Sequence, residues 1–97
     1  MLSESQFQAK LKKKLEKLFP GCIVLKNDPE LRPGIPDLLI LFHGKWAALE
    51  VKVSATAKHQ PLQDWYVSTM DEMSFAAFIH PSNEQDVLRA LQQALVP

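Results

Sequence analysis

Two apolar runs on either side of His43-Gly44 constrain the fold of this chain more than any other feature. The runs cover residues 38–42 and 46–53. A pair containing glycine between two such runs is typical of a β-hairpin. Both faces of this hairpin are apolar along most of their length, so we expect other parts of the chain to cover it on both sides.

The register of the hairpin brings three charged side chains to one face at its open end. A loop of two residues places Asp37 opposite Glu50, and Lys52 lies on the same face because side chains alternate along a strand. Directly opposed Cβ atoms lie roughly 4.5–5.5 Å apart, so the two carboxylates repel each other. A three-residue loop without a bulge would instead put Asp37 on the opposite face.

Two carboxylates and one lysine in this arrangement favour a metal site over a simple ion pair. An ion pair with Lys52 needs one acid only, whereas Asp37, Glu50 and a backbone carbonyl together offer the oxygen ligands that Mg²⁺ prefers. Such an ion polarises a phosphoryl oxygen, and a nearby lysine can orient the attacking water. The alternative is a structural pair in which one acid binds Lys52 and the other reaches solvent.

Residues Pro36–Asp37 followed by Glu50–Lys52 resemble the signature of the PD-(D/E)XK nucleases. The string over residues 33–39, Pro-Gly-Ile-Pro-Asp-Leu-Leu, is similar to the Gly-x-Pro-Asp of the virus-type replication-repair (VRR-Nuc) branch. In that branch a glutamine follows the Glu-x-Lys and opens a helix. Gln63 matches this glutamine best, and Gln60 is the alternative. The resemblance covers nearly the whole chain.

This resemblance implies a restriction-endonuclease-like core and a metal-dependent DNA endonuclease. Water would attack a phosphodiester in line, with Mg²⁺ as the cofactor and Mn²⁺ as a substitute. Similar stand-alone proteins act on Holliday junctions as homodimers, so we expect selectivity for branched DNA and two subunits with one site each. The implied catalytic residues are Asp37, Glu50, Lys52 and Gln63, and the implied metal ligands are Asp37, Glu50, Val51 through its carbonyl, and Glu4.

Residues 3–19 predict the first helix, with Ser3 as its N-cap and Gln6 in a capping box. Glu4 extends the apolar stripe of this helix, while Glu16 lies on a lysine-rich side. In the resembled family an acid from this helix approaches the metal, which makes Glu4 the candidate and Glu16 the alternative. Without the resemblance, an acid in a first turn is explained by the helix dipole alone.

The same helix carries the densest cluster of positive charge in the chain. The formal net charge is zero, so attraction to DNA has to come from local clustering. A run of lysines is typical of a solvated helix face, but a nuclease also needs cations for the phosphate backbone. The predicted DNA-binding residues are Lys10, Lys13, Lys14, Lys26, Arg32 and Lys58.

The remaining segments complete a single α/β domain over residues 1–97. The predicted order is α-β-β-β-α-β-α, with helices on both faces of a mixed, mainly four-stranded sheet. The later elements are a strand over 22–26, a loop over 27–36, a helix over 61–73 that starts at Pro61, a strand over 74–80, and a helix capped by Ser82 or Asn83 that runs to Leu95. The predicted inward side chains of the helix over 61–73 are Leu62, Tyr66, Thr69, Met70 and Met73.

Composition narrows the function classes. The single cysteine, Cys22, excludes an internal disulfide and a cysteine-rich zinc site. No apolar run is long enough to cross a membrane, so we expect a soluble, cytoplasmic protein. Two alternatives to an enzyme are a DNA-binding or assembly module that kept the nuclease fold and a partner-binding regulator that uses the lysine-rich helix.

Overall fold

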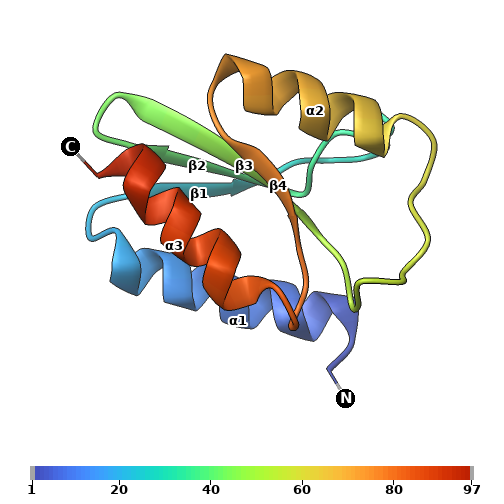
Figure 1. The fold of residues 1–97 in the computed structure, drawn as a ribbon, viewed down its shortest axis with the longest axis horizontal. Coiled ribbons are helices and arrows are strands. Elements are labelled where there is room, and N and C mark those ends of the chain that lie inside the picture. The colour runs from blue at the N-terminus through green and yellow to red at the C-terminus, as the bar shows by residue number, and fades with distance from the viewer. Residues whose placement is uncertain (1, 97) are drawn as a thin grey trace.

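A mixed four-stranded sheet separates two layers of helices in the computed structural model, which describes residues 2–96 (Figure 1). The strand order is β1-β2-β3-β4, in which the first three strands are antiparallel and β4 runs parallel to β3. The elements are α1 Glu4–Leu18, β1 Ile23–Lys26, β2 Leu38–Phe42, β3 Lys45–Val51, α2 Gln63–Met73, β4 Ala76–Ile79 and α3 Glu84–Leu95. This order confirms the predicted fold class.

The hairpin of β2 and β3 closes through the two-residue loop that its sequence predicts. Phe42 pairs with Lys45 directly across the loop, and the ladder continues to Leu38 opposite Leu49. Both loop residues have positive φ angles, 52° at His43 and 74° at Gly44. Such angles match the twist of the two strands and fix the register without a bulge. Asp37 and Glu50 are therefore the next pair along the hairpin.

The larger core lies on the face of the sheet that α1 and α3 cover, below the sheet in Figure 1. Phe7, Leu11 and Leu15 of α1 are buried there, as the spacing of the apolar stripe predicts. Leu91 and Leu95 of α3 are also buried on this face. The strands contribute Leu38, Ile40, Ala47, Leu49, Val51 and Ile79.

A smaller core lies on the opposite face, beneath α2. It is built from Ala48, Val67 and Ala76, with Leu39, Met70 and other half-buried side chains packed around it. The fold thus places its main apolar volume on one face and leaves less apolar packing on the other. The polar end of the hairpin belongs to this second face.

The predicted start of α2 is wrong by two residues. The helix begins at Gln63 rather than at Pro61, and Leu62 precedes it in a left-handed conformation with φ 72°. The inward side chains differ in part: Gln63 and Val67 are buried, whereas Leu62 and Met73 are 57% and 70% exposed. The other three predicted inward residues, Tyr66, Thr69 and Met70, are half-buried, and Met70 packs against the smaller core, so only the two ends of the predicted stripe are wrong.

The two other helix starts agree better with the sequence. Ser3 caps α1, with the Gln6 amide N–H donating to Ser3 Oγ and the Ser3 amide N–H donating to Gln6 Oε1, as the capping box predicts. Asn83 precedes α3, but its Oδ1 accepts from the His80 amide instead of capping the helix. None of the helices within residues 2–96 has the length and apolar character needed to cross a membrane.

Candidate active site

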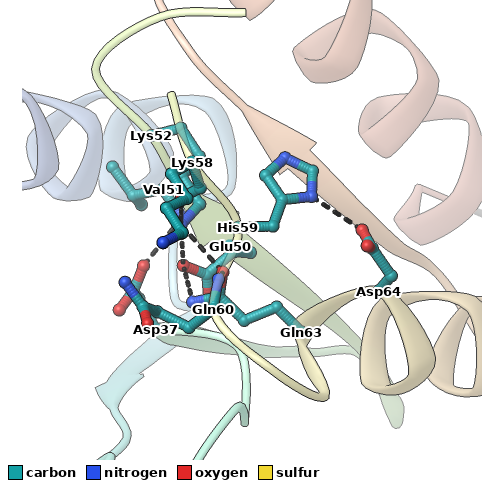
Figure 2. Close-up of polar contacts among 9 residues, drawn as sticks. All are labelled: Asp37, Glu50, Val51, Lys52, Lys58, His59, Gln60, Gln63 and Asp64. Atoms are coloured by element: carbon teal, nitrogen blue, oxygen red, sulfur yellow. Dashed lines mark hydrogen bonds and ion pairs between the residues drawn. The ribbon is translucent and has the colours of Figure 1, made fainter. Parts of the chain in front are cut away.

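Three polar side chains are buried within residues 2–96, and all three lie at the open end of the hairpin. Glu50 lies in β3, Lys52 follows that strand and Gln63 opens α2, with exposed fractions of 3%, 6% and 9%. Asp37, half-buried just before β2, lies beside them (Figure 2). Burying polar groups costs free energy, so their concentration at one point indicates a requirement other than folding. We call these four residues the polar cluster.

Hydrogen bonds fix the orientation of the Gln63 amide within the polar cluster. Gln63 Oε1 accepts from Lys52 Nζ at 2.8 Å and from the Gln60 amide N–H at 2.8 Å. With two donors on its oxygen, the side chain turns its Nε2 to Glu50 Oε2, at 3.0 Å. The structure therefore brings Gln63 to the carboxylates, while Gln60 contributes its backbone only and has an exposed side chain.

Lys52 is held by oxygen atoms on several sides. Its Nζ donates to the carbonyl oxygen of Lys58 at 3.1 Å, in addition to Gln63 Oε1, and lies 3.8 Å from Glu50 Oε2. An ammonium group has three donors, so this set of neighbours restrains it without requiring one tight ion pair. The ion-pair alternative assigns Lys52 to Glu50 and leaves Asp37 as the acid that reaches solvent, and Asp37 is half-buried.

Backbone contacts position Asp37. Asp37 Oδ2 accepts from the Val51 amide N–H at 2.8 Å, which ties the carboxylate to the end of β3. Asn27 holds the other side: its amide N–H donates to the Asp37 carbonyl oxygen and its Nδ2 donates to the Pro36 carbonyl oxygen, both at 2.8 Å. Sequence reasoning missed Asn27, although the extended β1–β2 register, which pairs Lys26 with Leu38, places it opposite Asp37.

Gly34 allows the loop before Asp37 to approach the start of α2. Its φ angle is +89°, and a Cβ atom at this position would lie 2.8 Å from Leu62 Cβ and 3.0 Å from the Pro61 carbonyl oxygen. Neither distance leaves room for a side chain. Leu62 itself is a bulky residue with positive φ, a strained conformation that persists only where the surroundings hold it. This contact joins the segments that carry Asp37 and Gln63.

The electrostatics of the polar cluster favour the binding of a cation. Burial, followed by the negative charge of the nearby Asp37, raises the pKa of Glu50 to about 8, and Lys52 only partly opposes this. Glu50 Oε1 is buried and has no hydrogen-bond partner among the described residues. With both acids ionised, two negative charges face one positive charge, so a cation would stabilise the ionised form.

The ligand atoms of the polar cluster fit Mg²⁺ if water molecules and a backbone carbonyl complete its coordination. Within residues 2–96, no three side chains of His, Cys, Asp or Glu are arranged to hold a metal ion together. Asp37 and Glu50 are thus the acidic ligands available, and Glu50 Oε1 is free to bind. Mg²⁺ usually keeps several waters and takes one or two carboxylates from a protein, so this set suits it.

The structure places the two acids of α1 differently. The charge of Glu4 contributes to the raised pKa of Glu50, although the Glu4 side chain is exposed and outside the polar cluster. Glu16 instead acts on Cys22, whose pKa is raised by burial and by the Glu16 carboxylate. Glu4 is therefore the acid of α1 that lies near the site, and Glu16 lies near the other end of the sheet.

The predicted DNA-binding residues do not form one patch. Lys14 is ion-paired with Glu84 of α3, and Lys10 shares with it a hollow beside that helix. Arg32 Nη1 lies 3.4 Å from the Tyr66 hydroxyl oxygen, close to α2. Of the other three, Lys13 is exposed on α1, Lys26 is exposed at the end of β1, and Lys58 is exposed next to Lys52 and contacts it through its carbonyl.

His59, which the sequence offered only as a possible phosphate contact, has a structural role beside the site. Its Nδ1 lies 2.7 Å from Asp64 Oδ1, and its ring stacks on Phe78 with centroids 4.1 Å apart and 15° between the planes. Figure 2 shows the ring turned away from Asp37 and Glu50 and toward Asp64. His59 lies between Lys58 and Gln60, whose backbones both contact the polar cluster, so it anchors that turn to α2 and β4. No sequence pattern marks a contact of this kind.

Comparison with known proteins adds no further constraint: no protein-family model, no curated protein and no solved structure matches this chain.

Proposed function

We propose that this protein is a Mg²⁺-dependent endodeoxyribonuclease that hydrolyses phosphodiester bonds, with selectivity for branched DNA. The observation that carries the proposal is the buried polar cluster, in which one carboxylate oxygen of Glu50, beside Asp37 and Lys52, has no hydrogen-bond partner among residues 2–96. Its residues coincide with the motif that resembles the VRR-Nuc branch of the PD-(D/E)XK nucleases. Function often lies where the fold tolerates such unfavourable burial.

Asp37, Glu50 and the backbone carbonyl of Val51 would hold the metal ion. When bound, Mg²⁺ would neutralise the excess negative charge of the site and polarise a phosphoryl oxygen. The Glu50 carboxyl has to lose its proton for this, since its pKa is about 8 in the metal-free protein. Metal affinity should therefore rise with pH.

Lys52 would orient the attacking water and offset the negative charge that develops on the phosphoryl oxygens. Its ammonium group is buried and restrained by two hydrogen bonds, which fixes the position of the charge before substrate binds. Gln63 connects the two functions, because its oxygen accepts from Lys52 and its Nε2 donates to Glu50. Preorganisation of this kind removes the cost of ordering these groups during the reaction.

The experiment that tests the proposal is cleavage of a labelled four-way junction, compared with linear duplex and single strand, in Mg²⁺, Mn²⁺ or EDTA. We expect metal-dependent cutting by the wild type that is lost in Asp37→Ala and Lys52→Ala. The ranking of substrates tests the preference for branched DNA. If no substrate is cut while wild type and both variants bind DNA equally, the protein is the non-catalytic DNA-binding module instead.

We also propose that the active species is a homodimer with one site in each subunit. Two arguments support this: one such small domain has little surface to grip a branched junction, and symmetric cutting of two strands calls for two sites. Sedimentation or gel filtration at micromolar protein concentration tests this. Full junction cleavage by a species with the mass of one subunit would exclude the dimer.

A further inference from the structure

A groove of about 280 Å³ lies between the first turns of α1 and the neighbouring strands β1 and β2. The volume is slightly below the roughly 300–1,000 Å³ of pockets that take small molecules, which suits a phosphodiester group better than a whole cofactor. Ala9, Val24 and Leu38 line it with apolar atoms, and Ser5, Gln8, Lys12 and Lys26 line it with polar groups. We call it the α1–β1 groove.

Within the part of the chain that the structure describes, the two lysines of the groove have no ion-pair partner. Lys12 and Lys26 are exposed, and neither forms a salt bridge with any residue between 2 and 96. Lys14, two positions further along the same helix, is paired with Glu84. Two cations that line one groove without an acid repel each other, and an anion between them would relieve this repulsion.

The helical repeat separates these lysines into two groups. Ser5, Gln8 and Lys12 are spaced three and four residues apart, so they share the flank of α1 that faces β1. Lys10 and Lys14 share the flank that faces α3. The lysine run of α1 therefore serves two surfaces, and only Lys12 adds its charge to the groove beside β1.

The groove lies at the same end of the hairpin as the polar cluster but on the opposite face of the sheet, because Leu38 belongs to the core beneath α1 and α3. Leu38, which lines it, directly follows Asp37 in the chain, and Lys26 is the β-ladder partner of Leu38. We propose that the α1–β1 groove binds a backbone phosphate of the DNA strand that is cut at the polar cluster, with Lys12 and Lys26 as its cationic contacts and Gln8 and Ser5 as neutral ones. This inference rests on the proposed nuclease function and deepens it.

The first test measures DNA binding without catalysis, by fluorescence anisotropy of a labelled junction and duplex in EDTA at several salt concentrations. The double variant Lys12→Ala/Lys26→Ala should raise the Kd about tenfold, since hydrogen bonds to charged groups are the stronger ones. For duplex DNA it should also reduce the slope of log K against log[salt], by about 0.9 for each phosphate that the protein no longer neutralises.

A matched control removes two positive charges elsewhere. Lys17→Ala/Lys45→Ala changes the net charge equally, but neither residue lines the groove. We expect this control to bind within twofold of the wild type. If both double variants lose affinity equally, or if neither loses any, the groove is not a phosphate site. Thermal unfolding of both variants verifies that each is folded.

The second test separates the groove from the catalytic proposal. Bis(4-nitrophenyl) phosphate is a small phosphodiester that can reach Asp37 and Glu50 without occupying the groove. With Mn²⁺, the groove variant should hydrolyse it at the wild-type rate while showing a raised KM for DNA, whereas Asp37→Ala should hydrolyse neither. If the wild type cuts nothing but the groove variant still loses DNA affinity, the nuclease proposal fails and the phosphate site stands.

Discussion

The two faces of the sheet are stabilised by different chemistry, although strand β3 supplies side chains to both. On the face covered by α1 and α3, Leu49 and Val51 are fully buried in the larger apolar core. Glu50 lies between them in sequence and is almost as buried, at 3% exposed, but it faces Asp37 and Gln63 on the other side.

Burial has opposite effects on these neighbours. Burying an aliphatic side chain contributes roughly 1.5–3 kcal/mol to stability, while burial and the nearby Asp37 disfavour the ionised form of Glu50 and raise its pKa. The apolar face therefore stabilises the domain, whereas the buried charge at the polar end of the other face lowers the free energy of unfolding. Variants on each face can separate these two contributions.

The largest expected effect comes from removing one charge at the polar cluster. Glu50→Gln keeps the shape of the side chain and an acceptor for Gln63 Nε2, but it removes a metal ligand. We expect metal-dependent DNA cleavage to fall at least about 100-fold, the scale of losing one preorganised electrostatic group. At pH 8.5 the metal-free variant should melt at a higher temperature than the wild type, because a disfavoured buried charge is gone.

Both measurements are needed to interpret this variant. Cleavage in Mg²⁺ and thermal unfolding in EDTA should move in opposite directions, toward lower activity and higher stability. A variant that cuts DNA at the wild-type rate would remove Glu50 from the site. A lower melting temperature at pH 8.5 would show that the Glu50 carboxylate stabilises the fold. The two faces would then not differ in the way proposed above.

The opposite pattern is expected on the apolar face. Leu91 of α3 is fully buried in the larger core, so Leu91→Ala should lower the free energy of unfolding by about 2–5 kcal/mol. Cleavage by the folded fraction, measured well below the melting temperature, should stay at the wild-type level. Urea unfolding gives the first quantity. Loss of cleavage by fully folded Leu91→Ala would mean that the two faces are coupled.

Stability of the metal-free protein should depend on pH through Glu50. Between the ordinary value of 4.5 and about 8, the folded protein keeps a proton that the unfolded chain has released. The free energy of unfolding therefore falls as pH rises through this window, by at most about 1.4 kcal/mol per pH unit for one proton. Urea unfolding at pH 5, 6, 7 and 8 measures it.

Two controls test whether Glu50 causes this pH dependence of stability. Glu50→Gln should remove most of the fall, since no carboxyl titrates at this position. Saturating Mg²⁺ should also reduce it, because a bound cation favours the ionised carboxylate and stabilises the folded state most at high pH. A wild-type profile that rises between pH 5 and 8 would contradict the raised pKa.

The smallest expected effect concerns the contact between the two loops of the site. Gly34→Ala must accommodate a positive φ and a Cβ atom 2.8 Å from Leu62 Cβ, so it should lower the free energy of unfolding by about 1–3 kcal/mol and lower cleavage several-fold. Gly21→Ala is the matched control, because its φ is +90° but nothing lies within 4 Å of the added Cβ.

The difference between these two glycine variants isolates the close approach. Both introduce a residue into the left-handed region, at a shared cost of about 1–2 kcal/mol, but Gly34→Ala alone pushes the segments of Asp37 and Gln63 apart. We expect reduced cleavage in Gly34→Ala and unchanged cleavage in Gly21→Ala. Equal activity in both would mean that this contact does not position the site.

Most of the fold could be predicted because local patterns specify it. His43-Gly44 between apolar runs indicated the two-residue loop, and the register then placed Asp37 beside Glu50. The capping box at Ser3 indicated the start of α1. The start of α2 could not be predicted in this way, because Pro61 is a typical first helical residue, whereas Leu62 takes a left-handed conformation beside Gly34 and the helix begins after it.

The contacts of the site that were missed all join distant segments. Asn27 holds the backbone on either side of the Pro36–Asp37 bond, and His59 anchors a turn to Asp64 and Phe78. Neither residue belongs to a motif. The choice between Glu4 and Glu16 was also open until the fold placed one near Glu50 and the other near Cys22.

The sequence by itself determined the hairpin, its register and therefore the pairing of Asp37 with Glu50, because the alternation of side chains and the geometry of a two-residue loop are local properties. Only the tertiary structure decided that the Gln63 amide joins Lys52 to Glu50. It also decided that one oxygen of Glu50 is buried without a partner among residues 2–96. Burial and electrostatic environment depend on every element packed around a group, and no local pattern encodes them.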